Sequence, residues 1–185
     1  MTTRWTAIDF ETATRERDSA CALGLAVIEG DRIVERRDWL IRPPGNRFEW
    51  MNTQVHGISA ADTSRAPGFE RVWDEIEPYL TDSMVLAHNA SFDVSVLRAS
   101  LARHGLAAPR ARYLCTVTMA RRMWPRLPDH KLSTVCESCG IDLIHHRAES
   151  DAAACATIAL RCLAESAVPT LGELAEALDM RPRSI

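Results

Sequence analysis

The sequence contains almost no lysine. Lys131 is the only lysine among 22 basic residues, so nearly all of the positive charge is carried by arginine. Arginine favours bidentate contacts with phosphates, although its abundance alone does not establish any. The net charge of −3 argues against a protein that coats nucleic acid, because such proteins are usually basic. It leaves open an enzyme that meets phosphates through bound metal ions.

Long apolar runs are also missing. The longest, over residues 152–160, is too short to span a bilayer, and the first residues lack the basic-then-apolar pattern of a secretory signal. The six cysteines mostly lie in apolar patterns, as reduced core thiols do. We find no repeats or low-complexity segments. These features predict a cytoplasmic protein without a membrane segment, whose 185 residues form one globular domain and a short appendage.

The hydrophobic pattern indicates an α/β protein. Three strands are expected first, followed by alternating strands and helices, which predicts a mixed sheet covered by helices. The expected strands cover residues 4–10, 22–30, 32–43 and 83–90, with a tight turn at residues 30–31. The expected helices cover residues 68–80, 91–105, 131–140, 148–166 and 170–180, and residues 111–124 indicate a strand that runs into a helix.

The stretch AIDFETA places two acids in an otherwise buried strand. Asp9 and Glu11 are two residues apart, so their side chains project from the same face. Two close, partly buried like charges repel each other, and a positive charge is therefore expected between them. The simpler alternative is a strand end with exposed acids.

Two further acids lie at the N-terminal ends of apolar faces of expected helices. Asp93 shares a face with Val96 and Leu97, and Asp151 shares one with Cys155 and Ile158. Each aspartate alone could be a first-turn acid favoured by the helix dipole. Together with Asp9 and Glu11, however, they could converge at one end of the sheet, where only cations would make four carboxylates tolerable.

Hard oxygen ligands select Mg²⁺ or Mn²⁺, and two such ions suit displacement at phosphorus. His146, five residues before Asp151, is a candidate base for removing a proton from water. A surface or structural role is the alternative for a single histidine.

These residues resemble the signature segments of a known family. DFET, HNASFD and HRAESD are similar, in order and spacing, to the three motifs of the DEDDh class of 3′-to-5′ exonucleases, which includes the proofreading epsilon subunit of bacterial replicative polymerases. The resemblance runs from about residue 4 to about residue 166. It implies a ribonuclease-H-like fold with a mixed five-stranded sheet, and an exonuclease domain over residues 1–168. It also implies that Asp9, Glu11, Asp93 and Asp151 bind two divalent ions and that His146 is the general base.

The same resemblance suggests substrate contacts. Thr12 and Ala13 would lie beside the terminal nucleotide, Phe92 near its base or sugar, and Asn89 would help to shape the site. His56, in VHGIS, is either a substrate contact or a histidine that stabilises a turn. The loop TATRERDSA departs from the Thr-Gly of many relatives, which leaves the substrate preference open.

Several alternatives remain at this point. The enzyme could act on the 3′ ends of DNA or, like an oligoribonuclease, trim RNA; it could serve a polymerase, or be a non-catalytic binding module. The segment 169–185, an amphipathic helix and tail, either packs on the domain or binds a partner. The arginines of residues 121–126 either line a nucleic-acid groove or end a solvated helix. The CESC motif at 136–139 fits an apolar helix face better than a zinc site.

Overall fold

A twisted sheet forms the centre of the molecule. The computed structural model describes residues 4–185, and in these residues six strands pair in the order β3-β2-β1-β4-β5-β6. The first three strands form an antiparallel meander, β4 and β5 run parallel to β1, and β6 runs antiparallel to β5. The strands are β1 (Trp5–Thr12), β2 (Ala20–Glu29), β3 (Arg32–Leu40), β4 (Met84–Ala87), β5 (Arg112–Cys115) and β6 (Arg183–Ser184).

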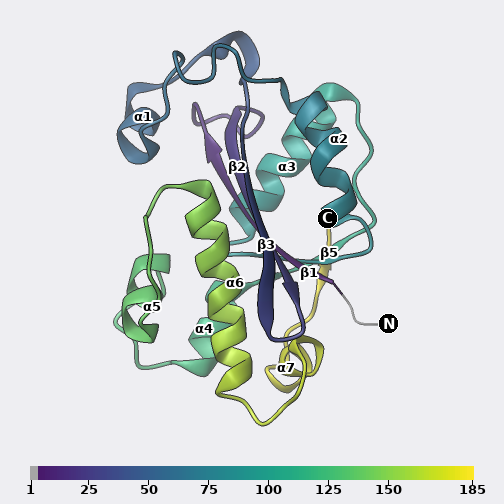
Figure 1. The fold of residues 1–185 in the computed structure, drawn as a ribbon, viewed down its shortest axis with the longest axis vertical. Coiled ribbons are helices and arrows are strands. Elements are labelled where there is room, and N and C mark those ends of the chain that lie inside the picture. The colour runs from purple at the N-terminus through teal and green to yellow at the C-terminus, as the bar shows by residue number, and fades with distance from the viewer. Residues whose placement is uncertain (1–3) are drawn as a thin grey trace.

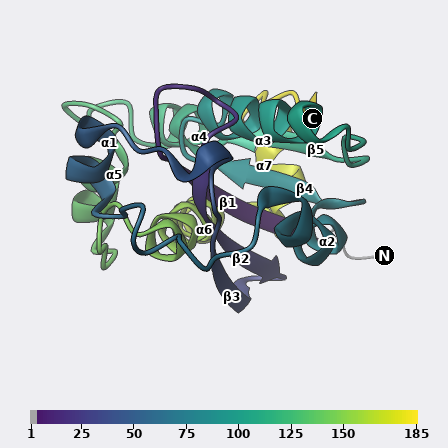
Figure 2. The ribbon, with the colours of Figure 1, turned by 90° about the horizontal axis from the view of Figure 1, so that it is seen from above.

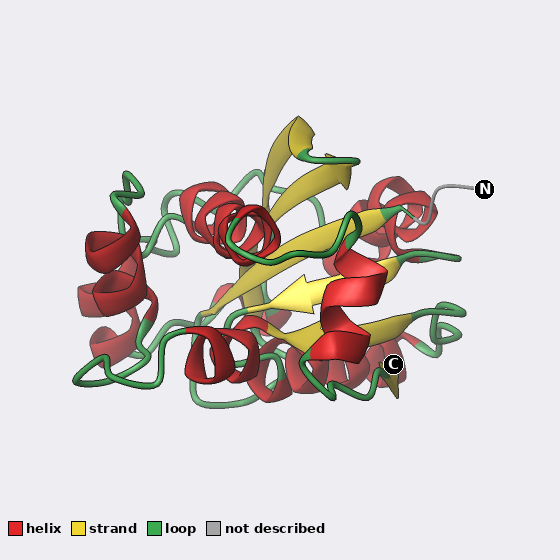
Figure 3. Ribbon diagram, turned by 90° about the horizontal axis from the view of Figure 1, so that it is seen from below, coloured by secondary structure: helices red, strands yellow, loops and turns green. Residues whose placement is uncertain are grey.

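Helices cover both faces of this sheet (Figures 1 and 3). One face packs against α4, α5, α6 and α7, and the other packs against α2 and α3. The helices are α1 (Trp50–His56), α2 (Phe69–Leu80), α3 (Ser91–His104), α4 (Thr116–Met123), α5 (Leu132–Cys139), α6 (Ala148–Ala164) and α7 (Leu171–Ala177), with a 3-10 turn at Pro44–Asn46. The predicted α/β class is therefore confirmed.

Alternation along β1 creates two separate cores. Trp5 and Ala7 pack beneath α6, whereas Ile8 and Phe10 point to the opposite face and pack against α2 and α3. Seen from above, β1 lies between α6 and α3 (Figure 2). Because the side-chain period of a strand is two, the α6 side of β1 continues with Asp9 and Glu11.

The predicted count of five strands is wrong, because a sixth strand is formed by the C-terminal segment. Arg183 and Ser184 pair with Tyr113 and Arg112 of β5. Two residues directly after Pro182 are too few to show the alternation by which strands are recognised. Helix α7 precedes this strand, and its apolar residues Leu171 and Leu174 are buried in the α6 core.

Helix α1 was not expected from the sequence. None of its residues is buried, and Trp50, Met51 and Val55 are exposed, so no apolar stripe faces the core. It ends at Gly57, whose φ of 77° is the left-handed conformation in which glycine commonly terminates helices. No helix within residues 4–185 is long and apolar enough to cross a membrane.

Candidate active site

The candidate site begins where β1 leaves regular pairing. Opposite Glu11 lies Ala22, but opposite Thr12 lies Ala20, so Cys21 is the extra residue of a β-bulge. Bulges re-aim side chains and are common beside active sites. Asp9 and Glu11 stay on the α6 side of the strand, as their spacing predicts, and both are partly exposed.

Asp93 reaches the site from the first turn of α3. Its side chain is 2% exposed, and its Oδ1 accepts a hydrogen bond of 2.9 Å from the backbone N–H of Phe10. This bond ties the start of α3 to the strand that carries Asp9 and Glu11. The position of Asp93 is thus fixed by the backbone of β1 rather than by another side chain.

Asp151 arrives from the first turn of α6 and is 3% exposed. A close approach of α6 to the sheet makes this possible: in β2, Gly24 lies opposite Asp9, and a Cβ atom on Gly24 would overlap the carbonyl group of Ala148. Only glycine leaves room for the backbone of α6 at that point. Gly24 was not singled out from the sequence, although a glycine inside an apolar strand signals a close backbone approach.

The four carboxylates influence one another strongly. Burial, followed by the charges of Asp93, Asp151 and Glu11, raises the pKa of Asp9 well above its usual value. Burial and the charges of Asp151 and Asp93 raise the pKa of Glu11 to about 8. Burial raises the pKa of Asp93 to about 7, and it also raises the pKa of Asp151. Without a cation, the site therefore holds protons that free carboxyl groups would have lost.

This donor set suits a divalent cation. Oxygen atoms of Asp9, Glu11 and Asp151 lie within 4.8 Å of one another, and Asp93 is close enough to repel Asp9. Carboxylate oxygens are the ligands that Mg²⁺ and Mn²⁺ prefer, and a cation would remove the repulsion that raises these pKa values. The predicted acids are thus brought together in one place. In contrast, Cys136 and Cys139 are buried in the α5 core.

Two histidines stand beside Asp151. The backbone N–H of His146 donates a 2.9 Å hydrogen bond to Oδ2 of Asp151, while Nδ1 of His145 lies 3.3 Å from the same oxygen. The two rings stack, with centroids 3.8 Å apart. Adjacent side chains in a loop usually point different ways, but here His146 has a left-handed φ of 65° and the two rings lie on the same side. Burial and the neighbouring His145 lower the pKa of His146.

The end of β1 is held by α1. Thr12 and Ala13 are buried, and the carbonyl group of Thr12 accepts a 2.9 Å hydrogen bond from Nδ2 of Asn52. His56 lies 3.1 Å from the same oxygen through Nε2. Its Nδ1 accepts from the N–H of Ile58, so the proton is on Nε2 and is donated to Thr12. These contacts are of the turn-stabilising kind; the substrate roles of Thr12, Ala13 and His56 stay predictions.

Asn89 and Phe92 lie at the start of α3. Asn89 adopts a left-handed φ of 71°, and its carbonyl group accepts from the N–H of Phe92. The guanidinium group of Arg17 sits 4.4 Å from the centre of the Phe92 ring. Arg17 comes from the loop that departs from the family pattern, and its charge lowers the pKa of Asp93. Neither Arg17 nor Asn52 was singled out from the sequence, because both depend on contacts between distant segments.

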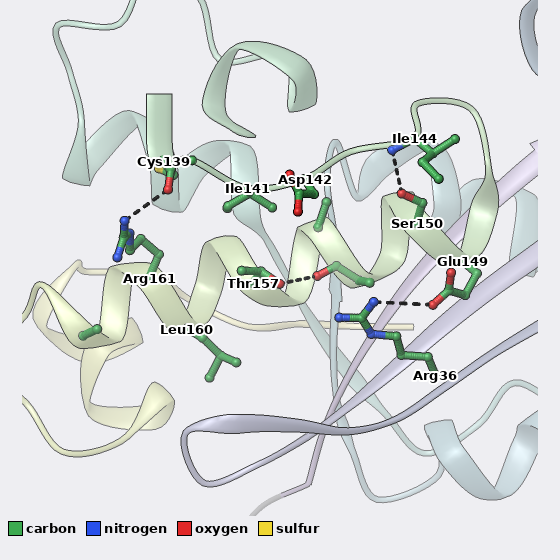
Figure 4. Close-up of a pocket in the computed structure, with 14 residues that line it drawn as sticks. Arg36, Cys139, Ile141, Asp142, Ile144, Glu149, Ser150, Thr157, Leu160 and Arg161 are labelled. Carbon is green, nitrogen blue, oxygen red and sulfur yellow. Dashed lines mark hydrogen bonds and ion pairs between the residues drawn. The ribbon is translucent and has the colours of Figure 1, made fainter. Parts of the chain in front are cut away.

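A groove of about 640 Å³ runs along α6 outside this site, between β3 and the loop before α6 (Figure 4). At one end Arg36 and Glu149 form an ion pair of 3.8 Å, and near the other Arg161 donates to the carbonyl group of Cys139. None of the predicted site residues lines this groove. The carboxylate cluster, and not this cavity, is therefore the candidate active site.

Comparison with known proteins identifies the family of this chain. The exonuclease family model RNase_T matches residues 6–159, and this chain belongs to that family. The exonuclease DinG of Bacillus subtilis, described as a 3′-5′ exonuclease, is 30% identical over 180 residues, which are 92% of this chain and 19% of DinG. A PolC-type DNA polymerase III of Halalkalibacterium halodurans is 33% identical over 102 residues, or 55% of this chain and 7% of the polymerase. The chain thus spans only a small part of these curated relatives.

Solved structures share the fold. Exonuclease X, determined in complex with 5′ overhanging duplex DNA, has a TM-score of 0.74 and 24% identity, and the match covers 94% of this chain and 99% of that one. Exonuclease I has a TM-score of 0.79 and 13% identity, over 95% of this chain and 43% of that one. These similarities confirm the predicted ribonuclease-H-like architecture.

Proposed function

We propose that this protein is a metal-dependent 3′-to-5′ exonuclease that releases nucleoside monophosphates from the 3′ end of DNA. The observation that carries this proposal is the convergence of four carboxylates from three segments at one end of the sheet. Family membership supports the reaction class, and the similarity to DinG supports the direction of digestion.

Asp9, Glu11, Asp93 and Asp151 would hold two divalent ions, Mg²⁺ or Mn²⁺. When bound, such ions activate an attacking water and stabilise the charge of the leaving oxygen. Four carboxylates balance the charge of two such ions. Hydrogen bonds from the backbone N–H groups of Phe10 and His146 hold Asp93 and Asp151 in fixed positions, so the protein contributes orientation as well as charge.

His146 would act as the general base. Its lowered pKa keeps the imidazole neutral near pH 7, which allows it to accept a proton. The imidazole would take a proton from the attacking water as the water oxygen forms a bond to the phosphorus. The bond between the phosphorus and the 3′ oxygen of the preceding nucleotide would then break, and that oxygen would leave. The stacked His145 ring limits the orientations of His146.

A non-catalytic binding module is the competing interpretation. Close, buried carboxylates destabilise a fold unless a cation occupies the site, and a module that only binds has no use for that arrangement. The raised pKa values of Asp9 and Glu11 therefore favour an enzyme. RNA remains the alternative substrate, as in an oligoribonuclease-like enzyme.

A labelled single-stranded oligonucleotide with Mg²⁺ or Mn²⁺ tests the proposal. We expect stepwise shortening from the 3′ end, release of nucleoside monophosphates, and complete inhibition by a chelator. An oligonucleotide with a 3′ phosphate is the control for direction, and matched DNA and RNA compare the substrates. Intact substrate with both metals at several pH values, or digestion from the 5′ end, would contradict the proposal.

The proposal extends to the cellular compartment and to a protein partner. The free cysteines, five of them buried, support a reducing compartment such as the cytoplasm. The similarity to PolC-type polymerases supports a DNA polymerase as a partner, with the domain acting on 3′ ends during synthesis. Co-purification of the wild-type protein with a replicative polymerase measures that association.

A further inference from the structure

We propose that a second groove, next to the active site, binds the phosphates of the substrate strand upstream of its 3′-terminal nucleotide. This inference rests on the proposed exonuclease function and adds to it the path of the strand. The groove has a volume of about 700 Å³ and lies beside β5. Arg121 and Arg122 of α4 line it, as do Arg181 and Arg183 of the C-terminal segment. We call it the arginine groove.

The charge in the arginine groove is not balanced within the described chain. All four arginines are exposed, and none forms an ion pair with a carboxylate of residues 4–185. Asp179 is the only acid that lines the groove. Four guanidinium groups around one cavity repel each other unless an anion lies between them, and their planar donor geometry matches phosphate oxygens.

The C-terminal segment is held firmly in this position. Arg112 donates from Nη2 to the carbonyl group of Pro182 at 3.3 Å, and Arg98 donates to that of Ser184 at 2.9 Å. The N–H of Ile185 donates to the carbonyl group of Ala111 at 3.1 Å, and the buried Met180 anchors the other end. Arg181 and Arg183 are thus presented from ordered backbone, which lowers the entropy lost when they bind.

The arginine groove and the carboxylates share a border. Asn89, Ala90 and Ser91 line the groove, and Phe92 and Asp93 follow them directly in the chain. A strand whose terminal nucleotide lies at Asp93 therefore reaches the groove by passing over Asn89–Ser91. Ser91 and Thr118 also line the groove, and a threonine hydroxyl such as that of Thr118 can donate a hydrogen bond to a phosphate oxygen.

Cations from two separate segments, α4 and the C-terminal segment, suit a chain of phosphates rather than one isolated anion. Single-strand binding sites combine a positive groove that follows the backbone with contacts that do not read sequence. We therefore expect binding without sequence preference and with a strong dependence on salt. The groove also assigns a function to the sixth strand, which contains Arg183 and holds the segment with Arg181 beside β5.

Two double variants test the proposal, namely Arg121→Ala with Arg122→Ala, and Arg181→Ala with Arg183→Ala. Binding of a fluorescein-labelled oligothymidylate is measured by anisotropy in Ca²⁺, with the oligonucleotide checked to be intact, over a series of salt concentrations. We expect each double variant to weaken binding about 3- to 30-fold. Each lost phosphate contact should also reduce the salt slope by about 0.7.

Hydrolysis of the p-nitrophenyl ester of thymidine 5′-monophosphate measures catalysis without a contribution from the arginine groove. In this small substrate p-nitrophenol is the leaving group, and there are no upstream phosphates to bind the groove. We expect the groove variants to hydrolyse it within about twofold of the wild type, since they keep the whole catalytic set. If the wild type cleaves neither this ester nor oligonucleotides, the proposed exonuclease function is wrong. The anisotropy measurement would still show whether the arginine groove binds single-stranded DNA.

The control is the double variant Arg32→Ala with Arg71→Ala, which removes the same charge from exposed arginines that do not line the groove. We expect it to bind oligothymidylate as the wild type does. Circular dichroism melting confirms that all variants fold. Restored binding in the double Arg→Lys variants supports a charge effect. Unchanged binding in both groove variants, or an equal loss in the control, overturns the inference.

Discussion

Individual side chains in this site are arranged against their own electrostatic preference. Asp93 is almost fully buried, and its charge is offset only in part by hydrogen bonds from the backbone N–H groups of Phe10 and Asp93 and by the nearby charge of Arg17. Burial is the largest cause of the raised pKa of Asp9, and the charges of the other three carboxylates raise this pKa further. Such an arrangement is stable only with a cation or with bound protons, and this property allows metal binding to be separated from folding.

Asp9→Asn is the first test at this scale. The amide keeps the shape of the side chain but removes one charge, so hydrolysis should be lost and stabilisation by Mn²⁺ should fall. In chelator, however, the variant should melt higher than the wild type, because it relieves repulsion; about 1 kcal/mol corresponds to roughly 2–4 °C for a chain of this size. Differential scanning fluorimetry with and without Mn²⁺ measures both effects. A variant that melts lower in chelator would show that Asp9 stabilises the fold in another way.

The two stacked histidines provide the second test. Removal of the His146 imidazole should lower turnover by about 10² to 10⁴, the usual effect of losing a general base. We prefer His146→Asn to alanine, because asparagine tolerates the left-handed φ of 65° at this position. The backbone N–H to Asp151 is kept, so metal affinity should change little.

His145→Ala is the matched variant. His145 contacts Asp151 through its ring, so its loss should weaken the affinity for Mn²⁺ modestly and leave turnover at saturating metal nearly unchanged. Turnover measured over a Mn²⁺ titration distinguishes the two variants. If His145→Ala has the lower turnover at saturating Mn²⁺, His145 and not His146 is the base.

At the scale of elements, the site depends on how closely α6 approaches the sheet. Asp151 can join Asp9 only because β2 has no side chain at Gly24, where the backbone of Ala148 crosses the strand. The buried residues of α6 include many alanines, such as Ala152 and Ala156. The run of alanines is therefore a packing surface that places the helix carrying Asp151.

Gly24→Ala tests this approach. The added methyl group would overlap backbone, which cannot move without shifting the first turn of α6, so we expect a loss of stability of about 1–3 kcal/mol. Turnover should fall at least tenfold, because Asp151 moves with that turn. Gly172→Ala is the control: its new methyl group would meet only the Thr170 hydroxyl at 3.8 Å, and it should behave as the wild type. Normal turnover in Gly24→Ala would show that α6 need not lie so close.

The sequence predicted those elements that have a strong local pattern. The acids of β1 and the first-turn aspartates of α3 and α6 were found because each stands at a fixed place in an apolar repeat. Helix α1 and strand β6 were missed, since α1 buries no residue and β6 has only two. Contacts between distant segments, such as Asn52 with Thr12, leave no local pattern at all.

For the whole molecule, folding is linked to pH through the carboxylate cluster. Unfolded carboxyl groups lose their protons near pH 4, whereas Asp93 and Glu11 in the metal-free fold hold theirs to about pH 7 and 8. Between these values the folded state binds more protons than the unfolded state, so this contribution to stability is lost as the pH rises. Histidines act in the opposite sense: burial lowers the pKa of His88 to about 4, and its contribution is lost as the pH falls below about 6.5.

Between about pH 6.5 and 8 we expect the carboxylate effect to prevail, and comparison with Glu11→Gln separates it from the titration of histidines and cysteine thiols. In chelator, the melting temperature of the wild type should decrease across this window, and that of Glu11→Gln should decrease less. With saturating Mn²⁺ the slope should disappear or reverse, because the ion binds the ionised carboxylates of the folded state and stabilises it by mass action. Fluorimetric melting curves at constant ionic strength measure both slopes. A melting temperature in chelator that rises with pH over this window would mean that the metal-free cluster is already ionised, and that its negative charges are balanced by groups other than a bound cation.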